Sequence, residues 1–532
     1  MMSYSRRRML LSLSGFGTAL VRPQTSRSEA TPSRGGTINL LLAAEPPTIT
    51  TIAQTAYNSV YASPKVTEGL LTYDFDLRPL PQLAIAWSIS ADGLRYEFRL
   101  RPGVKWHDGQ KFTSADAAYS IAAIKEVHPR GRSTFGNLIG IETPDPLTLV
   151  LVLSRPAPYL ISALAASETP IVPKHLYEGT RPETNPVNNA PIGTGPFIFK
   201  AWARGSHILL ERNPDYWDAP KPYVDQVVIR IMPDIAARAA AIETGQIQLA
   251  PATPIPLSDL ERFEHLPNVA LERRGYQYAN SISRVEFNLD RPCFQDVRVR
   301  RAFAHVIDRK VIHQTINYGY GDVIPGPFST NLTQFYYGNL RTYPIDLARA
   351  EALLDASGLK RGEDGIRLRL THDYVPSGES YRRGADYIRQ ALAKVGIAVS
   401  VRSQDFAAYT KRVYTDRDFD FTFNGMSNLF DPTVGVQRLY WSKNFRPGVP
   451  FSNGAHYSNP KVDALLEAAA VEMDPKTRYQ QFLDFQNIVV EDVPDIGIGT
   501  QPDLTLYDRK VAGHTVGAEG VAGNLANVHF LA

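Results

Sequence analysis

Hydrophobic positions along this chain recur with the two periods that are typical of strands and of helices. From Tyr96 to Leu100, apolar side chains alternate with charged ones, which predicts a strand with one buried and one solvated face. Pro102 and Gly103 end this strand. Thr113 then precedes Asp116 by three residues, the spacing at which a hydroxyl and a carboxylate cap the start of a helix. The segment is therefore predicted to be a strand, a turn and a helix start.

The same two periods predict further elements along the rest of the chain. Asn459 and Asp474 each stand directly before a proline, which marks the start of two helices. A mixed α/β protein follows from this order of elements. The predicted strands are 147–153, 227–232, 366–370 and 397–401, and the predicted helices are 298–307, 381–395, 461–473 and 477–490.

Residues 96–109, with the continuation 112–116, resemble a signature of the extracytoplasmic solute-binding proteins of family 5, which serve peptide-, oligopeptide-, dipeptide- and nickel-type ABC importers. Each further block is weak alone, but their order along the chain is specific. The resemblance runs from Gly36 to Thr505. It implies an α/β fold of the periplasmic binding protein type, class II-like, with two lobes and an extra domain. The further blocks are 191–197, 213–217, 241–247, 287–288, 296–303, 307–309 and 457–463, with Asp225 between the second and the third.

The resemblance also implies how the chain divides into domains. The chain is expected to cross between the lobes more than once, and domain I is built from three separated segments. We predict a signal peptide at 1–30, domain I at 35–78, 190–276 and 500–532, domain II at 79–189, and domain III at 277–499.

The first thirty residues have the composition of an export signal. Ser5 precedes three arginines, and the apolar run that follows, 10–21, is too short to span a bilayer. The paired arginines resemble a twin-arginine signal. The only cysteine, Cys293, lies far from this segment, so no thiol is available there for a lipid. We therefore expect a periplasmic protein without a lipid anchor.

The charge of the chain excludes one class of partner. Its formal net charge is +3, and because residues 1–30 hold five arginines and one glutamate, their removal would change it to −1. A nearly neutral chain gives no reason to expect nucleic-acid binding. The resemblance implies a small-molecule or peptide ligand, a membrane permease as partner, a monomer, and neither cofactor nor metal.

Peptide-binding relatives hold the ligand's amino terminus with an aspartate that lies shortly before an Asp-Pro pair. Here Asp431 and Pro432 match that pair, and the spacing places the amine-holding position on Asn428. Met426 and Ser427 belong to the same segment. An amide binds an ammonium group less strongly than a carboxylate does, so Asn428 argues against a ligand held by a free peptide amine.

Other candidate ligand contacts come from the same resemblance. The segment that carries an arginine in dipeptide binders is 372–376 here, and it contains Asp373 and Tyr374 but no arginine. Asp373 or Asp431 could hold an amine, and Arg438 could hold a carboxylate. Tyr57 and Asn58, in an expected loop of the first lobe, would line the cleft. We expect a peptide, or a peptide-like or opine-like solute.

Two other functions stay open from the sequence. An exported hydrolase would need catalytic residues, but the chain has neither a Gly-x-Ser-x-Gly elbow nor a His-Glu-x-x-His motif. Paired carboxylates of glycoside hydrolases can lie far apart in a chain, so the sequence does not decide that case. The adjacent His107 and Asp108 are predicted to point apart on a turn and to be structural. A chaperone-like periplasmic binder is the other alternative.

Overall fold

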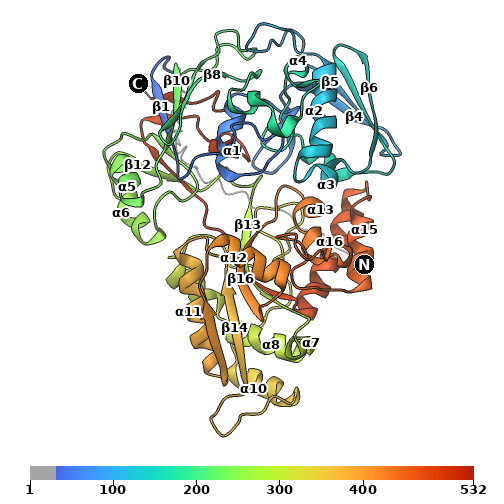
Figure 1. The fold of residues 1–532 in the computed structure, drawn as a ribbon, viewed down its shortest axis with the longest axis vertical. Coiled ribbons are helices and arrows are strands. Elements are labelled where there is room, and N and C mark those ends of the chain that lie inside the picture. Colours follow the sequence, from blue (N-terminus) through green and yellow to red (C-terminus); the bar gives the residue numbers. More distant parts are fainter. Residues whose placement is uncertain (1–31, 532) are drawn as a thin grey trace, which may run out of the picture.

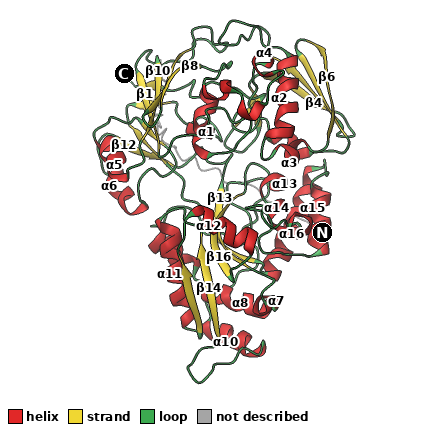
Figure 2. Ribbon diagram, in the orientation of Figure 1, coloured by secondary structure: helices red, strands yellow, loops and turns green. Residues whose placement is uncertain are grey.

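The computed structural model describes residues 32–531, so the predicted signal segment lies outside the described residues. The described part of the chain forms two lobes, with helices and strands in both (Figure 1). Helices and sheets are mixed throughout each lobe (Figure 2). The predicted two-lobe α/β fold is confirmed.

A seven-stranded sheet forms one part of the first lobe, in the order β12-β18-β11-β1-β10-β9-β8. The central strand β1 pairs in parallel with β10 and β11, and the outer pairs are antiparallel. The strands are β1 (Thr37–Leu42), β8 (Phe197–Ala203), β9 (His207–Arg212), β10 (Gln226–Ile231), β11 (Leu249–Ala250), β12 (Val269–Glu272) and β18 (Thr505–Asp508). The first lobe also contains α1 (Tyr57–Ala62), α5 (Ile235–Glu243), α6 (Leu260–Glu264) and the short pairs β2 (Leu71–Tyr73) with β3 (Pro79–Pro81) and β19 (Val511–Ala512) with β20 (His529–Phe530).

A four-stranded antiparallel sheet forms the other part of the first lobe, in the order β4-β5-β7-β6. Tyr96, Phe98 and Leu100 are buried on β5 while their neighbours are exposed, which confirms the predicted alternation. At the start of α2, the Asp116 carboxylate accepts the Thr113 backbone N–H at 2.9 Å, as a capping box requires. The elements are β4 (Ala84–Ile89), β5 (Arg95–Leu100), β6 (Leu138–Asp145), β7 (Thr148–Leu153), α2 (Ser114–Val127), α3 (Gly131–Phe135) and α4 (Lys174–Tyr177).

The second lobe is built on a five-stranded sheet in the order β15-β14-β16-β13-β17. Both predicted helix starts are confirmed, because Asn459 accepts the Lys461 N–H at 2.9 Å and Asp474 accepts the Thr477 N–H at 2.8 Å. The strands are β13 (Ser281–Phe287), β14 (Leu368–Tyr374), β15 (Ile397–Arg402), β16 (Phe421–Ser427) and β17 (Asp495–Thr500). The helices are α7 (Pro292–Gln295), α8 (Val297–Val306), α9 (Arg309–Val311), α10 (Leu347–Ala356), α11 (Glu379–Ala393), α12 (Phe406–Thr410), α13 (Pro432–Gly435), α14 (Gln437–Tyr440), α15 (Pro460–Ala469) and α16 (Pro475–Asp492).

Two segments connect the lobes, 273–280 between β12 and β13 and 501–504 between β17 and β18. They run close together, because the Gln501 N–H donates to the Ser281 carbonyl at 2.9 Å. The first of these segments also contacts the first lobe, where the Tyr278 hydroxyl donates to the Ser162 carbonyl at 2.9 Å. The three large sheets use residues assigned to domains I, II and III respectively, except that β17 ends at Thr500, one residue beyond the predicted border of domain III, and the domain borders stay a prediction.

Residues 32–531 contain neither a membrane-spanning helix nor a cluster of metal-binding side chains. None of the helices there has both the length and the apolar content to cross a membrane. No group of three or more His, Cys, Asp or Glu side chains is arranged there to hold a metal ion.

Candidate functional site: a cationic cavity between the lobes

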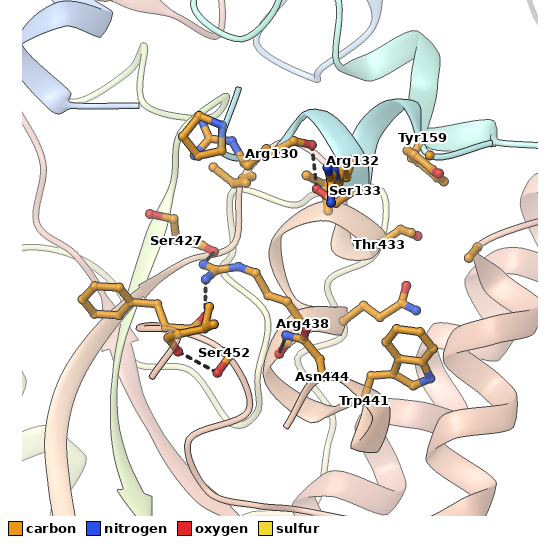
Figure 3. Close-up of a pocket in the computed structure, with 18 of the residues that line it drawn as sticks. Arg130, Arg132, Ser133, Tyr159, Ser427, Thr433, Arg438, Trp441, Asn444 and Ser452 are labelled. Atoms are coloured by element: carbon orange, nitrogen blue, oxygen red, sulfur yellow. Dashed lines mark hydrogen bonds between the residues drawn. The ribbon is translucent and has the colours of Figure 1, made fainter. Parts of the chain in front are cut away.

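A cavity of about 1240 Å³ lies between the two lobes. The first lobe contributes the end of α2, the start of α3 and residues near Tyr159, and the second contributes the end of β16, α13, α14 and the loop that follows (Figure 3). Its size exceeds the usual range of small-ligand pockets, so it can hold a solute of several residues.

Cationic side chains outnumber acidic ones around this cavity. Six basic residues and two acidic residues line it, although the whole chain carries a net charge of only +3. The local excess of positive charge therefore does not reflect the composition of the protein. The basic residues are Arg130, Arg132, Arg155, Arg438, Lys443 and Arg446, and the acidic ones are Glu126 and Glu467.

Arg438 on α14 is fixed by backbone carbonyls alone. Its Nε donates to Gly435 at 3.0 Å, one Nη donates to Phe451 at 2.5 Å, and the other Nη donates to Ser427 at 3.2 Å. Figure 3 shows the guanidinium between Ser427 and the segment that carries Ser452. Burial, together with the nearby charges of Arg130 and Arg284, lowers the pKa of Arg438 to about 10. The side chain therefore stays charged at neutral pH in a positive environment.

Arg130 faces the cavity from the first lobe, in the short connection between α2 and α3. Its Nε donates to Glu168 at 2.7 Å, and the second contact of this pair makes it bidentate. The connection turns tightly, since a Cβ at Gly131 would lie 2.0 Å from the Ile124 carbonyl oxygen. Beside it, burial lowers the pKa of His128 to about 4, so this ring is neutral at physiological pH.

Apolar and aromatic side chains supply the rest of the cavity wall. Tyr159 lies on the first-lobe side, and Trp441 and Phe451 lie on the second-lobe side. Met426 and Leu429 add aliphatic surface. Such surfaces cover the apolar parts of a ligand while a few polar groups orient it.

Three of the residues that the sequence proposed for ligand binding line this cavity. Met426 and Ser427 stand at the end of β16, and Arg438 stands on α14. The Ser427 hydroxyl is 3.1 Å from the hydroxyl of Ser281, on the neighbouring strand β13. That these three residues contact a ligand stays a prediction.

Asn428 lies behind the cavity wall. It is fully buried, its Oδ1 accepts the Ser329 N–H at 2.6 Å, and its own N–H donates to the Asn280 carbonyl at 2.9 Å. Its backbone also packs against α13, where a Cβ at Gly435 would lie 1.8 Å from the Asn428 carbonyl oxygen. The contacts of Asn428 hold the loop in place, and the side chain is not among those that line the cavity.

Asp431 and Asp373 do not fit the role of amine partner that the sequence allowed. The Asp431 carboxylate caps α13 and forms a buried bidentate ion pair with Arg478, with N–O distances of 2.8 and 2.9 Å. Asp373 is fully buried and accepts from Arg402 at 2.6 Å and from Gln404 at 2.8 Å. Both carboxylates are satisfied within the second lobe and lie away from the cavity wall.

The remaining candidates also lie outside the cavity wall. Tyr57 and Asn58 belong to helix α1 and not to the expected loop, and the Tyr57 hydroxyl bonds that of Tyr61, one helical turn later, at 2.8 Å. Tyr374 is buried in β14, where its hydroxyl donates to Ser403 at 3.0 Å. Their contribution to ligand binding stays untested.

His107 and Asp108 have separate partners, as predicted. The His107 Nε2 is 2.9 Å from the Gly195 carbonyl oxygen, and the Asp108 carboxylate is 2.7 Å from the ring of His175. Burial lowers the pKa of His107 to about 4, so its ring is a neutral structural contact.

The sequence interpretation missed the basic side chains that line the cavity from the first lobe. Arg130 and Arg132 stand close together in a run of basic residues after a predicted helix, and Arg155 follows a predicted strand. The run 128–132 was a visible signal of local positive charge. Its position opposite Arg438 depends on how the lobes pack, which no local pattern encodes.

The chain matches the family model described as bacterial extracellular solute-binding proteins, family 5 (middle), over residues 78–448. It belongs to this family, whose members are extracytoplasmic substrate-binding proteins that work with ABC permeases. Among curated relatives, it is 27% identical to the glutathione-binding protein GsiB of Pectobacterium atrosepticum over 478 residues, 87% of each chain.

Two solved structures are similar over nearly the whole chain. DppA from Helicobacter pylori, in complex with the peptide STSA, has a TM-score of 0.77 and 27% identity, covering 94% of this chain and 98% of DppA. AgaA from Agrobacterium tumefaciens R10, in complex with agropinic acid, has a TM-score of 0.75 and 25% identity, covering 93% of this chain and 99% of AgaA. Relatives of the same fold are thus solved with chemically different solutes.

Proposed function

We propose that this protein captures a peptide, or a peptide-like or opine-like solute, in the cavity between its lobes and delivers it unchanged to an ABC permease. The observation that carries the proposal is the large cavity lined by both lobes, with aromatic walls and a fixed guanidinium. A ligand that touches both lobes favours their closed arrangement by its higher affinity for that state. The closed form is then what the permease recognises.

The relatives support this range of solutes without selecting one. DppA binds a peptide and AgaA binds agropinic acid within the same fold. Because the fold is shared and the solutes differ, the side chains of the cavity decide specificity. We propose that the protein acts as a monomer and has no catalytic activity.

The proposal also includes the cellular compartment of the protein. Residues 1–30 direct export through the twin-arginine route, and the protein remains in the periplasm without a lipid anchor. Fractionation of expressing cells tests this, with the protein expected in the osmotic-shock fluid. Replacement of Arg6 and Arg7 by lysine is expected to retain the precursor in the cytoplasm, and unchanged export would contradict the twin-arginine assignment.

Mass spectrometry of solutes released from natively purified protein tests the central claim. We expect one small solute in a one-to-one complex. After unfolding and refolding, the empty protein should bind that solute again and return it intact, whereas a hydrolase would return fragments. Capture of unfolded chains without a saturable small ligand would favour the chaperone-like alternative.

A further inference from the structure

We propose that the solute is a polyanion, an acidic peptide-like molecule with at least two carboxylates, and that Arg438 together with the cavity arginines Arg132, Arg155 and Arg446 selects it. This inference rests on the proposed function and adds the charge class of the substrate to it.

Arg438 supplies the fixed anchor for one carboxylate. Three of its five N–H donors are used by the carbonyls of residues 427, 435 and 451, which leaves two donors for a ligand. Within the described part of the chain, no carboxylate lies within 4.0 Å of its nitrogens. A carboxylate that accepts two N–H groups from one guanidinium forms a strong, directional contact. The orientation is set before a ligand arrives, so little side-chain entropy is lost on binding.

Three more arginines extend the positive surface. Arg132 and Arg155 come from the first lobe, and Arg446 comes from the loop after α14. All three are exposed, and residues 32–531 provide no ion-pair partner for any of them. Because they flank the cavity on both lobes, an anion between them reduces the repulsion that opposes closure.

The other charged groups of the cavity do not cancel this excess. Lys443 pairs with Glu467 at 2.5 Å, and Arg130 pairs with Glu168, so these two basic groups are compensated inside the protein. Glu126 is the one lining acid of the described chain without an ion pair. Positive charge remains in excess among the side chains that line the cavity, and the volume of about 1240 Å³ can hold an anion of several residues.

Calorimetry with three tetrapeptides of equal length tests the charge class. The probes are Ala-Glu-Glu-Ala, Ala-Gln-Gln-Ala and Ala-Lys-Lys-Ala, titrated into refolded, ligand-depleted full-length mature protein. We expect the Glu peptide to bind at least about tenfold more tightly than the Gln peptide, and the Lys peptide to bind most weakly. The preference should shrink as NaCl is raised, because salt screens exposed charges.

Variants assign the preference to named side chains. Arg438→Gln is expected to weaken binding of the Glu peptide about 10- to 100-fold and to bring its affinity close to that of the Gln peptide. Because Arg438 also holds three carbonyls, Arg132→Gln provides a second test at an exposed position, with an expected loss of about two- to fivefold. Arg99→Gln, an exposed arginine on β5 outside the cavity, is the matched control and should bind like the parent.

The outcomes separate this inference from the proposed function. Equal affinity for the Glu and Gln peptides, or a neutral or cationic solute in the native complex, would overturn the inference and leave a transport binder. A dicarboxylic or more acidic solute in the native complex would support both. Failure of all three peptides, combined with natively purified protein that carries no small solute, would overturn the proposed function and the inference with it.

Discussion

Two guanidinium groups of the second lobe have different partners: Arg284 is fully buried in the core, whereas Arg438 is partly buried at the cavity. Arg284, in the core, is within 2.8 Å of both Glu286 and Asp495, and these carboxylates outweigh the effect of burial and raise its pKa. Arg438, at the cavity, has carbonyl oxygens as its only described partners, and its pKa is lowered. Arg284 therefore has two carboxylate partners in the core, whereas Arg438 has none among the described residues.

His372 is a third basic group of the second lobe, and unlike an arginine it can lose its proton when it is buried. His372 is fully buried against Phe421, neither ring nitrogen has a hydrogen-bond partner among residues 32–531, and burial lowers its pKa to about 3. The ring is therefore neutral at pH 7. An arginine keeps its charge at physiological pH, and Arg438 has no carboxylate partner within residues 32–531. This difference is the physical basis for expecting an anionic ligand.

The largest expected effect concerns the buried ion pair between Asp431 and Arg478. In Asp431→Ala, the buried Arg478 loses the carboxylate that binds it through two hydrogen bonds, and the free energy of unfolding is expected to fall by about 3–5 kcal/mol. Urea denaturation followed by circular dichroism measures this loss. Asp416→Ala is the control, because its pair with Lys411 is exposed and its loss should cost less than about 1 kcal/mol. Equal losses in the two variants would contradict the distinction between buried and exposed pairs.

The next largest effect concerns His372 and the dependence of the free energy of unfolding on pH. The folded protein binds a proton at His372 only near pH 3, whereas the unfolded chain binds one near pH 6.5, so stability is lost as the pH falls below 6.5. At pH 5 this residue should cost roughly 2 kcal/mol of the free energy of unfolding relative to pH 7. His372→Phe, which keeps an aromatic ring against Phe421, is expected to reduce the loss between pH 7 and pH 5.

Unfolding curves of the parent and the His372→Phe variant at the two pH values provide the measurement. His265→Phe is a suitable control, because the His265 side chain is exposed on the surface after α6. An identical loss between pH 7 and pH 5 in all three proteins would show that the His372 site accepts a proton in the folded state.

The smallest expected effect concerns Glu467, an acidic residue that lines the cavity. Glu467 compensates Lys443 at a largely exposed position, so Glu467→Gln should change the free energy of unfolding by less than about 1 kcal/mol. It should also raise the positive potential of the cavity and tighten binding of Ala-Glu-Glu-Ala about two- to fivefold at low salt. Glu97→Gln, an exposed acid on β5 outside the cavity, is the calorimetric control. Weaker binding in Glu467→Gln would contradict the electrostatic account.

Local patterns predicted much of the fold because their causes are local. The alternation from Tyr96 to Leu100 gave β5, and the side chains of Asn459 and Asp474 cap the helices that were predicted after them. Helix α1 was missed, since six residues are too few to show a periodic pattern. Of the candidate ligand contacts, Met426 and Ser427 at the end of β16 and Arg438 on α14 line the cavity.

The sequence alone determined the family, the α/β architecture and the segment with Met426 and Ser427 that contributes to the cavity. These features depend on the hydrophobic periods of strands and helices and on the order of short motifs, which are properties of the linear sequence. Only the tertiary structure decided which charges are compensated. Asp431 finds Arg478 and Asp373 finds Arg402 across many residues of sequence, while Arg438 and Arg130 line the same cavity from different lobes. Electrostatic energy depends on distance through space and on burial, and both are set by packing and not by position in the chain.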